Sequence, residues 1–152
     1  MPLRVDHAAD LLAFVGTERP PSDEFTLTQA DVDHFVEISG DRQWIHSDAK
    51  RARAELPAGR TIVPGNLLLA QVPRLLQQIY LVERFDKCLV AGYRDVRFRQ
   101  AVSTGARLRL HATFLSVTPA RAFVRVETQC RLDLLESAAP ALTAVVTDLF
   151  YG

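Results

Sequence analysis

The spacing of hydrophobic and polar residues divides the chain into a helical first half and a strand-rich second half. Up to about residue 80, apolar residues recur at intervals of three and four positions, which is typical of amphipathic helices. From Cys88 onward, apolar and polar residues alternate with a period of two, which predicts strands. Helices followed by strands with short connections predict an α+β class with an antiparallel sheet.

The first half contains clear start and stop signals for helices. The pattern predicts helices over residues 5–15, 29–39 and 48–55, and a short strand over residues 24–27. Thr28 with Asp31 three residues later predicts a capped helix start, and Asp48 is expected to cap the third helix. Gly40 is expected to end the second helix in a left-handed conformation.

The most apolar helix is predicted over residues 66–80. Its first half is apolar on every side, as in helices that are buried all round. Pro73 lacks an amide donor and its ring clashes with the carbonyl of Leu69, so a kink or break is expected there. The simplest architecture wraps the sheet around this helix. Its strands are predicted at residues 94–99, 107–111, 123–130 and 141–150.

Composition and charge narrow the function classes. A chain of 152 residues is expected to form one domain, and it has 18 basic and 18 acidic residues, which gives no support to nucleic-acid or anionic-membrane binding. No apolar stretch approaches 18 residues, so no membrane span is expected, and no secretory signal is visible. Cys88 and Cys130 are expected to be reduced thiols in a cytoplasmic protein.

Candidate chemistry is concentrated just after the second helix. Asp41 and His46 lie five residues apart in a predicted loop, a common location for functional side chains. They either form a catalytic pair or satisfy the loop itself, with Asp41 bonding nearby amides and His46 packed. No cluster has zinc-ligand spacing, so no metal is expected. No nucleophile-elbow, phosphate-loop or dinucleotide motif occurs.

A family resemblance rests on these residues. The segment from Ser39 to His46, then Asp48, then Ile62-Val63-Pro64-Gly65 at the start of the apolar helix, resembles the MaoC-like dehydratases, which include the (R)-specific enoyl-CoA hydratases. Residues 41–46 are most similar to the nodulation protein N branch. The resemblance covers residues 25–150 and implies a hot-dog fold, a curved antiparallel sheet around a long central helix. Residues 1–152 would form one domain, with residues 1–23 as an N-terminal helix and loop.

The resemblance also implies a reaction, the reversible addition of water to a trans-2-enoyl thioester. In such hydratases an Asp and a His hold and activate one water, and they match Asp41 and His46. A glycine amide at the start of the central helix polarises the thioester carbonyl, and it matches Gly65, which is otherwise a turn glycine. Hydration needs such groups, because a base must take a proton from water, an acid must protonate the α-carbon and donors must face the enolate oxygen.

Four further residues are expected to contact substrate. Gln43 stands where the family usually has Asn, and Asn66 follows the helix glycine. Trp44 is either a packed aromatic residue or a wall of the acyl site. Arg97 belongs to a group of strand arginines that either form a solvated face or contact coenzyme A phosphates. No cofactor is expected beyond the coenzyme A or acyl-carrier arm of the substrate.

The resemblance implies a homodimer, and an exposed sheet edge is also best protected by pairing. Two departures from the family pattern keep a second interpretation open. Pro64 replaces a usual His, and Pro73 replaces a Ser near the catalytic pair, so the chain is alternatively a non-catalytic acyl-thioester-binding or partner subunit. A thioesterase is a third interpretation, but residues 66–80 contain none of the carboxylates that hydrolysis normally requires.

Overall fold

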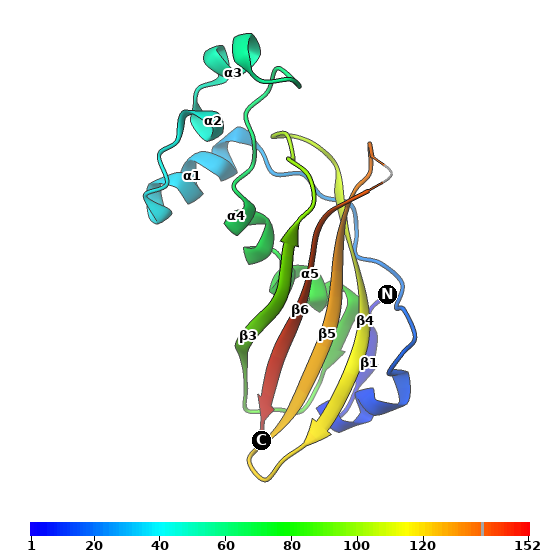
Figure 1. Cartoon of the computed structure of the whole chain (residues 1–152). Coiled ribbons are helices and arrows are strands. Elements are labelled where there is room, and N and C mark those ends of the chain that lie inside the picture. Colours follow the sequence, from blue (N-terminus) through cyan, green and yellow to red (C-terminus); the bar gives the residue numbers. More distant parts are fainter. Residues whose placement is uncertain (138) are drawn as a thin grey trace.

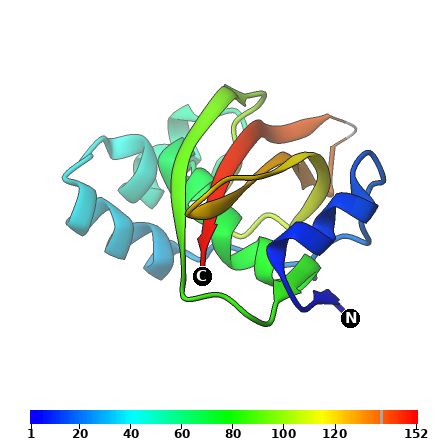
Figure 2. The same cartoon turned by 90° about the horizontal axis from the view of Figure 1, so that it is seen from below.

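A computed structural model describes residues 1–137 and 139–152. A four-stranded antiparallel sheet curves around two helices, with three further helices at one end (Figures 1 and 2). The strands are β3 (Lys87–Phe98), β4 (Leu108–Pro119), β5 (Phe123–Leu134) and β6 (Pro140–Tyr151). They lie in the order β3-β6-β5-β4, so the chain crosses from one edge of the sheet to the other after β3. The predicted α+β class is confirmed.

The two edges of the sheet differ in exposure. Buried residues alternate along β4, with Leu108, Leu110 and Phe114 facing the core. Strand β3 has no buried residue, and Leu89 and Phe98 are among its exposed apolar side chains. Its pairing with β6 shifts register twice, once between Val90 and Gly92 and once between Arg94 and Arg97. Beta-bulges of this kind bend a strand and redirect its side chains.

Two short helices replace the single central helix that the pattern predicts. Helix α4 spans Gly65–Ala70 and helix α5 spans Val72–Ile79, with Gln71 between them. The break that Pro73 predicts is therefore confirmed. Proline is tolerated in the first turn of α5, where its missing amide would have no partner within the helix. After α5, β2 (Tyr80–Val82) pairs in parallel with β1 (Leu3–Val5).

The N-terminal segment covers the β4 edge. The first predicted helix is a 3-10 helix, η1 (Ala8–Phe14), and Gly16 follows it with φ +82°. The chain then runs along β4, where the amides of Gly16, Arg19, Ser22 and Phe25 donate to its carbonyls. The predicted strand over residues 24–27 is wrong. Within this range only Phe25 forms an isolated β-bridge, with Leu108. The carbonyl of Leu27 accepts a hydrogen bond from the amide of Gly105 instead.

Three helices form a group beside the end of the sheet. They are α1 (Gln29–Ser39), α2 (Trp44–Ser47) and α3 (Ala49–Glu55). The predicted cap of α1 is confirmed, because the Thr28 side chain accepts from the Asp31 amide and the Asp31 carboxylate accepts from the Thr28 amide. Hydrogen bonds from the amide and the hydroxyl of Thr28 to the Asp31 carboxylate lower the pKa of Asp31. Gly40 ends α1 at φ +76°, and Asp48 caps α3, as predicted.

Two remaining expectations concern thiols and membrane spans. Cys88 and Cys130 are both free thiols. No helix among residues 1–137 and 139–152 combines the length and the apolar character that crossing a bilayer requires.

Candidate active site

His46 is a buried residue of helix α2, not of a loop as the sequence predicts. The turn of helix forms because the amide of Asp48 donates to the carbonyl of Trp44. The His46 Nδ1 atom lies 2.6 Å from the carbonyl oxygen of Ile62. A carbonyl oxygen only accepts hydrogen bonds, so Nδ1 must carry the proton of the neutral ring. The Nε2 atom is then the one available for proton transfer.

Asp41 lies beside this free nitrogen. Its Oδ2 atom is 3.6 Å from Nε2 of His46, and the Asp41 side chain is 41% exposed against 7% for His46. This distance is too long for a direct hydrogen bond. One water oxygen placed about 2.8 Å from each atom would complete a triangle with both. The geometry therefore allows the pair to hold a single water between an exposed carboxylate and a buried imidazole.

A partly buried hydrogen-bond network supports the backbone of His46. Gln29, the first residue of α1, donates from Nε2 to the His46 carbonyl oxygen at 2.8 Å. The Oε1 atom of Gln29 accepts from the Thr61 hydroxyl at 2.6 Å, and Thr61 also lies 2.7 Å from the hydroxyl of Thr104. Sequence reasoning missed these residues, because their separation of 17 to 43 positions leaves no local signal.

Gly65 begins α4, next to His46 in space. Pro64 occupies the N-cap position and provides no side-chain cap. The aromatic ring of Phe98 packs so closely that a Cβ atom at residue 65 would lie 2.8 Å from its Cε1 atom. Real side chains do not approach this closely, so glycine lets β3 pack against the start of the helix. The first amides of a helix lack partners within it and favour negative charge.

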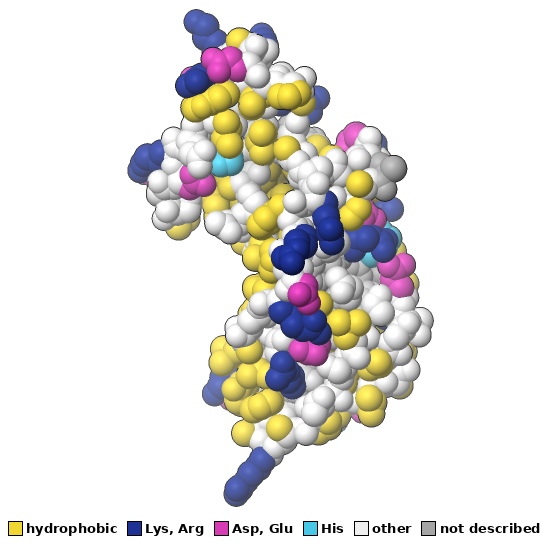
Figure 3. All heavy atoms as spheres, in the orientation of Figure 1, with side chains coloured by type: hydrophobic (Ala, Val, Ile, Leu, Met, Phe, Trp, Pro, Cys, Tyr) yellow, Lys and Arg dark blue, Asp and Glu magenta, His cyan; other side chains and the backbone are white. Residues whose placement is uncertain are grey.

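A cavity of about 460 Å³ brings several predicted site residues together. Its walls come from α2, the segment before α4, α4 itself, and the end of β3 with the residues after it. The lining residues are His46, Ile62, Val63, Gly65, Asn66, Leu68, Phe98, Gln100, Ala101 and Val102. Hydrophobic side chains also show at the narrow region between the helical group and the sheet (Figure 3). His46, Gly65 and Asn66 thus share one cavity, with Asp41 beside it.

Three other predicted contact residues do not line this cavity. Trp44 packs under the guanidinium of Arg51, which lies 3.9 Å from the ring centroid, so it joins α2 to α3. Gln43 is the exposed residue before α2. Arg97 is exposed on β3, and its guanidinium donates to the neighbouring carbonyl of Val96. Successive side chains of a strand point to opposite faces, so Phe98 enters the cavity and its neighbour Arg97 does not.

Comparison with protein families and curated proteins gives consistent matches. The family model described as MaoC like domain matches residues 11–133. The chain is 36% identical over 140 residues to 3-hydroxyacyl-thioester dehydratase Z of Mycobacterium tuberculosis, covering 91% of this chain and 92% of that protein. It is 30% identical over 138 residues to nodulation protein N of Rhizobium leguminosarum bv. viciae, covering 90% and 86%.

Solved structures agree on the architecture. The R-hydratase PhaJ1 from Pseudomonas aeruginosa aligns with a TM-score of 0.73 at 20% identity, covering 90% of this chain and 81% of that one. The (R)-hydratase from A. caviae involved in PHA biosynthesis aligns with a TM-score of 0.71 at 21% identity, covering 88% and 94%. These matches confirm the predicted hot-dog fold, and the matches in sequence confirm the resemblance on which it rested.

Proposed function

Because the chain belongs to the MaoC-like domain family, we propose that it is a hydro-lyase. It would add water reversibly to a trans-2-enoyl thioester to give the (R)-3-hydroxyacyl thioester. A relative named as a 3-hydroxyacyl-thioester dehydratase matches over nearly its whole length, which supports this reaction class. The observation that carries the proposal is the free Nε2 atom of His46, placed beside Asp41 and beside a cavity that contains Gly65.

In this proposal Asp41 and His46 act as a unit on one water. The water oxygen attacks the β-carbon of the enoyl group, and one of its protons passes to the pair. The pair then delivers a proton to the α-carbon, while the second hydrogen of the water stays on the new β-hydroxyl, so both hydrogens are accounted for. The Ile62 carbonyl holds Nδ1–H, which directs Nε2 toward the water throughout. General acid–base catalysis of this kind contributes about 10²- to 10⁴-fold in rate.

Gly65 would supply the amide that stabilises the enolate. Negative charge grows on the thioester oxygen as water adds, and a fixed donor aimed at that oxygen lowers the barrier. The position at the start of α4 supports this role, as does its place in the same cavity as His46. Asn66 lies beside it and is a candidate second polar contact. This chemistry needs no resident cofactor, since the thioester arrives with its own carrier.

We propose a homodimer that pairs through β3. Among the described residues, β3 pairs on one side only, and it exposes Leu89, Val90 and Phe98. An exposed apolar edge strand favours association with another strand. Gln43, Trp44 and Arg97 are candidate substrate contacts across such an interface, although they do not line the cavity within one chain. We propose a cytoplasmic location and an acyl carrier that is either coenzyme A or a carrier-protein arm.

The deciding experiment follows the loss of enoyl absorbance with crotonyl-CoA and with longer trans-2-enoyl-CoAs. We expect turnover by the native chain and loss of at least 10²-fold in both Asp41→Asn and His46→Ala. His34→Gln, an exposed histidine on α1, is the matched control and should retain activity. Chiral analysis of the product tests the (R) assignment. Full activity in both site variants would show that other residues do the chemistry.

One structural feature favours the alternative that the chain is a non-catalytic acyl-thioester-binding subunit. Pro64 caps α4 without a side-chain donor, where the resemblance implies a histidine. A binding subunit would retain affinity for acyl thioesters but turn over neither the coenzyme A nor the carrier-protein forms. A thioesterase would instead release a free thiol, which a thiol reagent detects. Helices α4 and α5 carry no carboxylate, which disfavours that third function.

A further inference from the structure

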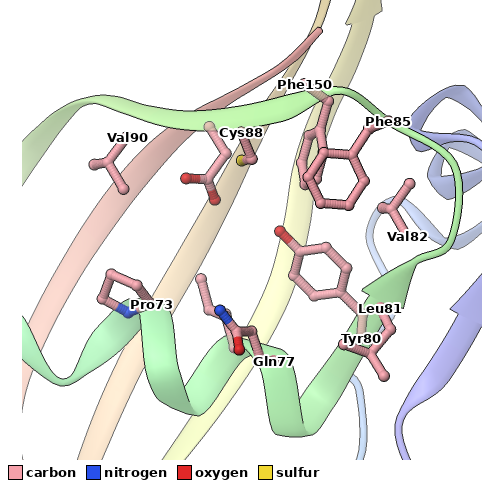
Figure 4. Close-up of a pocket in the computed structure, with 11 residues that line it drawn as sticks. Pro73, Gln77, Tyr80, Leu81, Val82, Phe85, Cys88, Val90 and Phe150 are labelled. Carbon is pink, nitrogen blue, oxygen red and sulfur yellow. The ribbon is translucent and has the colours of Figure 1, made fainter. Parts of the chain in front are cut away.

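Strand β3 supplies side chains to two cavities. Near its start, Cys88 and Val90 face a mainly apolar cavity of about 370 Å³ beneath α5 (Figure 4). Asp148 of β6, which is 6% exposed, lines the same cavity. Phe98, the last residue of β3, lines the other cavity together with His46. No described residue lines both cavities, so an effect of Phe98 on substrate binding is expected at the proposed catalytic site.

A β-bulge directs Phe98 into its cavity. Between Arg94 and Arg97, β3 advances three residues while its partner β6 advances two. Side chains alternate between the two faces of a sheet, so one extra residue moves every later side chain to the opposite face. Without the bulge, Phe98 would share a face with Arg94; with it, Phe98 pairs with Leu142, which is buried. Asp95 lies inside the bulge at φ +53°, a left-handed conformation that aspartate tolerates better than most residues.

The ring of Phe98 contacts Gly65 but takes little part in the core. Its Cε1, Cδ1 and Cζ atoms lie 2.8, 3.0 and 3.0 Å from the position that a Cβ atom of residue 65 would occupy. Among the described residues, Phe98 belongs neither to the main buried core nor to the apolar residues packed against it. Pairing of β3 with a second copy would use backbone groups in the plane of the sheet, so it does not account for a ring directed at the cavity.

The position of the ring matters for the substrate, and this step rests on the proposed function. There the thioester oxygen accepts from the Gly65 amide, and the water held by Asp41 and His46 attacks the β-carbon. The α-carbon lies between these two points and is bonded directly to the carbonyl carbon. Because Phe98 packs against Gly65, the ring stands beside the part of the substrate that contains the carbonyl group and the α-carbon.

We propose that Phe98 is a specificity-determining residue that selects acyl thioesters without a substituent on the α-carbon. A methyl group at that carbon would have to displace the ring, as a methyl group at Gly65 would. One extra carbon in a filled apolar space reduces binding by about tenfold or more. The substrate class is therefore the thioesters that are unbranched next to the carbonyl group.

The test is calorimetric binding of two isomers, butanoyl-CoA and 2-methylpropanoyl-CoA. They contain the same atoms and differ in whether the α-carbon carries a methyl branch, so they are matched in apolar character. Both acyl groups are saturated, so neither can be hydrated and the measurement needs no turnover. We expect the native chain to bind butanoyl-CoA about tenfold more tightly.

Variants of one residue locate this preference. Phe98→Ala removes the ring and should reduce the preference to less than about twofold, mainly by improved binding of the branched isomer. Phe98→Tyr retains the ring and should retain the preference. Leu115→Ala changes another exposed apolar residue, on β4 and outside both cavities, and should also leave the preference unchanged. Melting curves establish that each variant is folded, and Phe98→Leu replaces Phe98→Ala if the latter is not.

The results separate this proposal from the proposed reaction. Equal binding of the two isomers by the native chain, binding of neither, or a preference that survives loss of the ring would overturn the role of Phe98. A ring that contacts the carrier arm instead would give the last of these results, because both isomers would lose affinity equally. A preference that depends on Phe98 without turnover of crotonyl-CoA would support the role of Phe98 and count against the hydro-lyase alone.

Discussion

Asp41 and Asp148 are two aspartates at two cavities of one chain, in opposite surroundings. Asp41 is partly exposed and lies 3.6 Å from an imidazole that can take up or release a proton. Asp148 is buried among apolar side chains, has no cationic partner among the described residues, and has a raised pKa of about 6. The difference shows how burial without a cationic partner raises the pKa of an aspartate.

The largest expected effect separates the two aspartates by activity. Asp41→Asn should lower kcat/KM for crotonyl-CoA by about 10³-fold, because the amide cannot exchange a proton with the water. Asp148→Asn should change it by less than about threefold, since the proposed catalytic groups lie in the other cavity. Steady-state kinetics on both purified variants make the comparison. Similar losses in the two variants would mean that the cavities are functionally coupled.

The next expected effect is on the free energy of unfolding, to which Asp148 and Asp41 should contribute differently. The pKa of Asp148 is about 6 in the folded chain against 3.8 ordinarily, so the folded state binds the extra proton between these values. Stability contributed by this group is therefore present below about pH 4 and falls as pH rises to about 6. Above pH 7 the ionised group destabilises the fold by about 3 kcal/mol.

Urea unfolding of Asp148→Asn measures this effect. The variant should gain about 2 to 3 kcal/mol over the native chain at pH 7.5 and show little difference at pH 4. Asp41→Asn should lack this pH-dependent gain, because its side chain is not buried. A gain of equal size at both pH values would indicate better packing rather than removal of a charge.

A smaller effect is expected at the helix glycine. Gly65→Ala places a Cβ atom 2.8 Å from the ring of Phe98, which must then move across the cavity of His46. We expect kcat/KM to fall by about 30-fold and the fold to lose about 1 kcal/mol, as in other overpacked sites. The double variant Gly65→Ala, Phe98→Leu should recover part of the activity. No recovery would argue that the backbone itself, not the ring, is displaced.

The smallest expected effect concerns the network behind His46. Thr61→Val keeps the side-chain shape but removes the hydroxyl that donates to Gln29, and Gln29→Leu removes the donor to the His46 carbonyl. Each should lower kcat by about tenfold with little change in KM, because the imidazole is less well oriented. Thr26→Val, at an exposed position, is the control. A lower melting temperature with unchanged kcat would leave the network a structural role alone.

The features that the sequence predicted are mostly local. Thr28 and Asp31 cap α1 from three residues apart, Gly40 ends the helix through its own φ angle, and Pro73 breaks the central helix through its own ring. The hot-dog fold, in contrast, came from the resemblance. Alternation alone predicted strands but neither their length of 12 residues nor the order β3-β6-β5-β4.

The features that the sequence did not reveal depend on distant contacts. Gln29 reaches His46 across 17 positions, and Tyr80, just after α5, meets Asp148 of β6 from a distant part of the sequence. The pattern in β6 shows an aspartate among valines but not the cavity beneath it. The turn of α2 was missed because four residues are too few to show helical periodicity.

The N-terminal segment covers one edge of the four-stranded sheet, which limits how many copies of the chain can associate. Residues 16–25 occupy the β4 edge by donating amides to its carbonyls, so one edge remains for pairing. If two copies join through β3 by a two-fold axis, both edges of the four-stranded sheet in each copy are then covered. Association through this sheet would then stop at the dimer, because the N-terminal segment covers the β4 edge and prevents open-ended strand pairing.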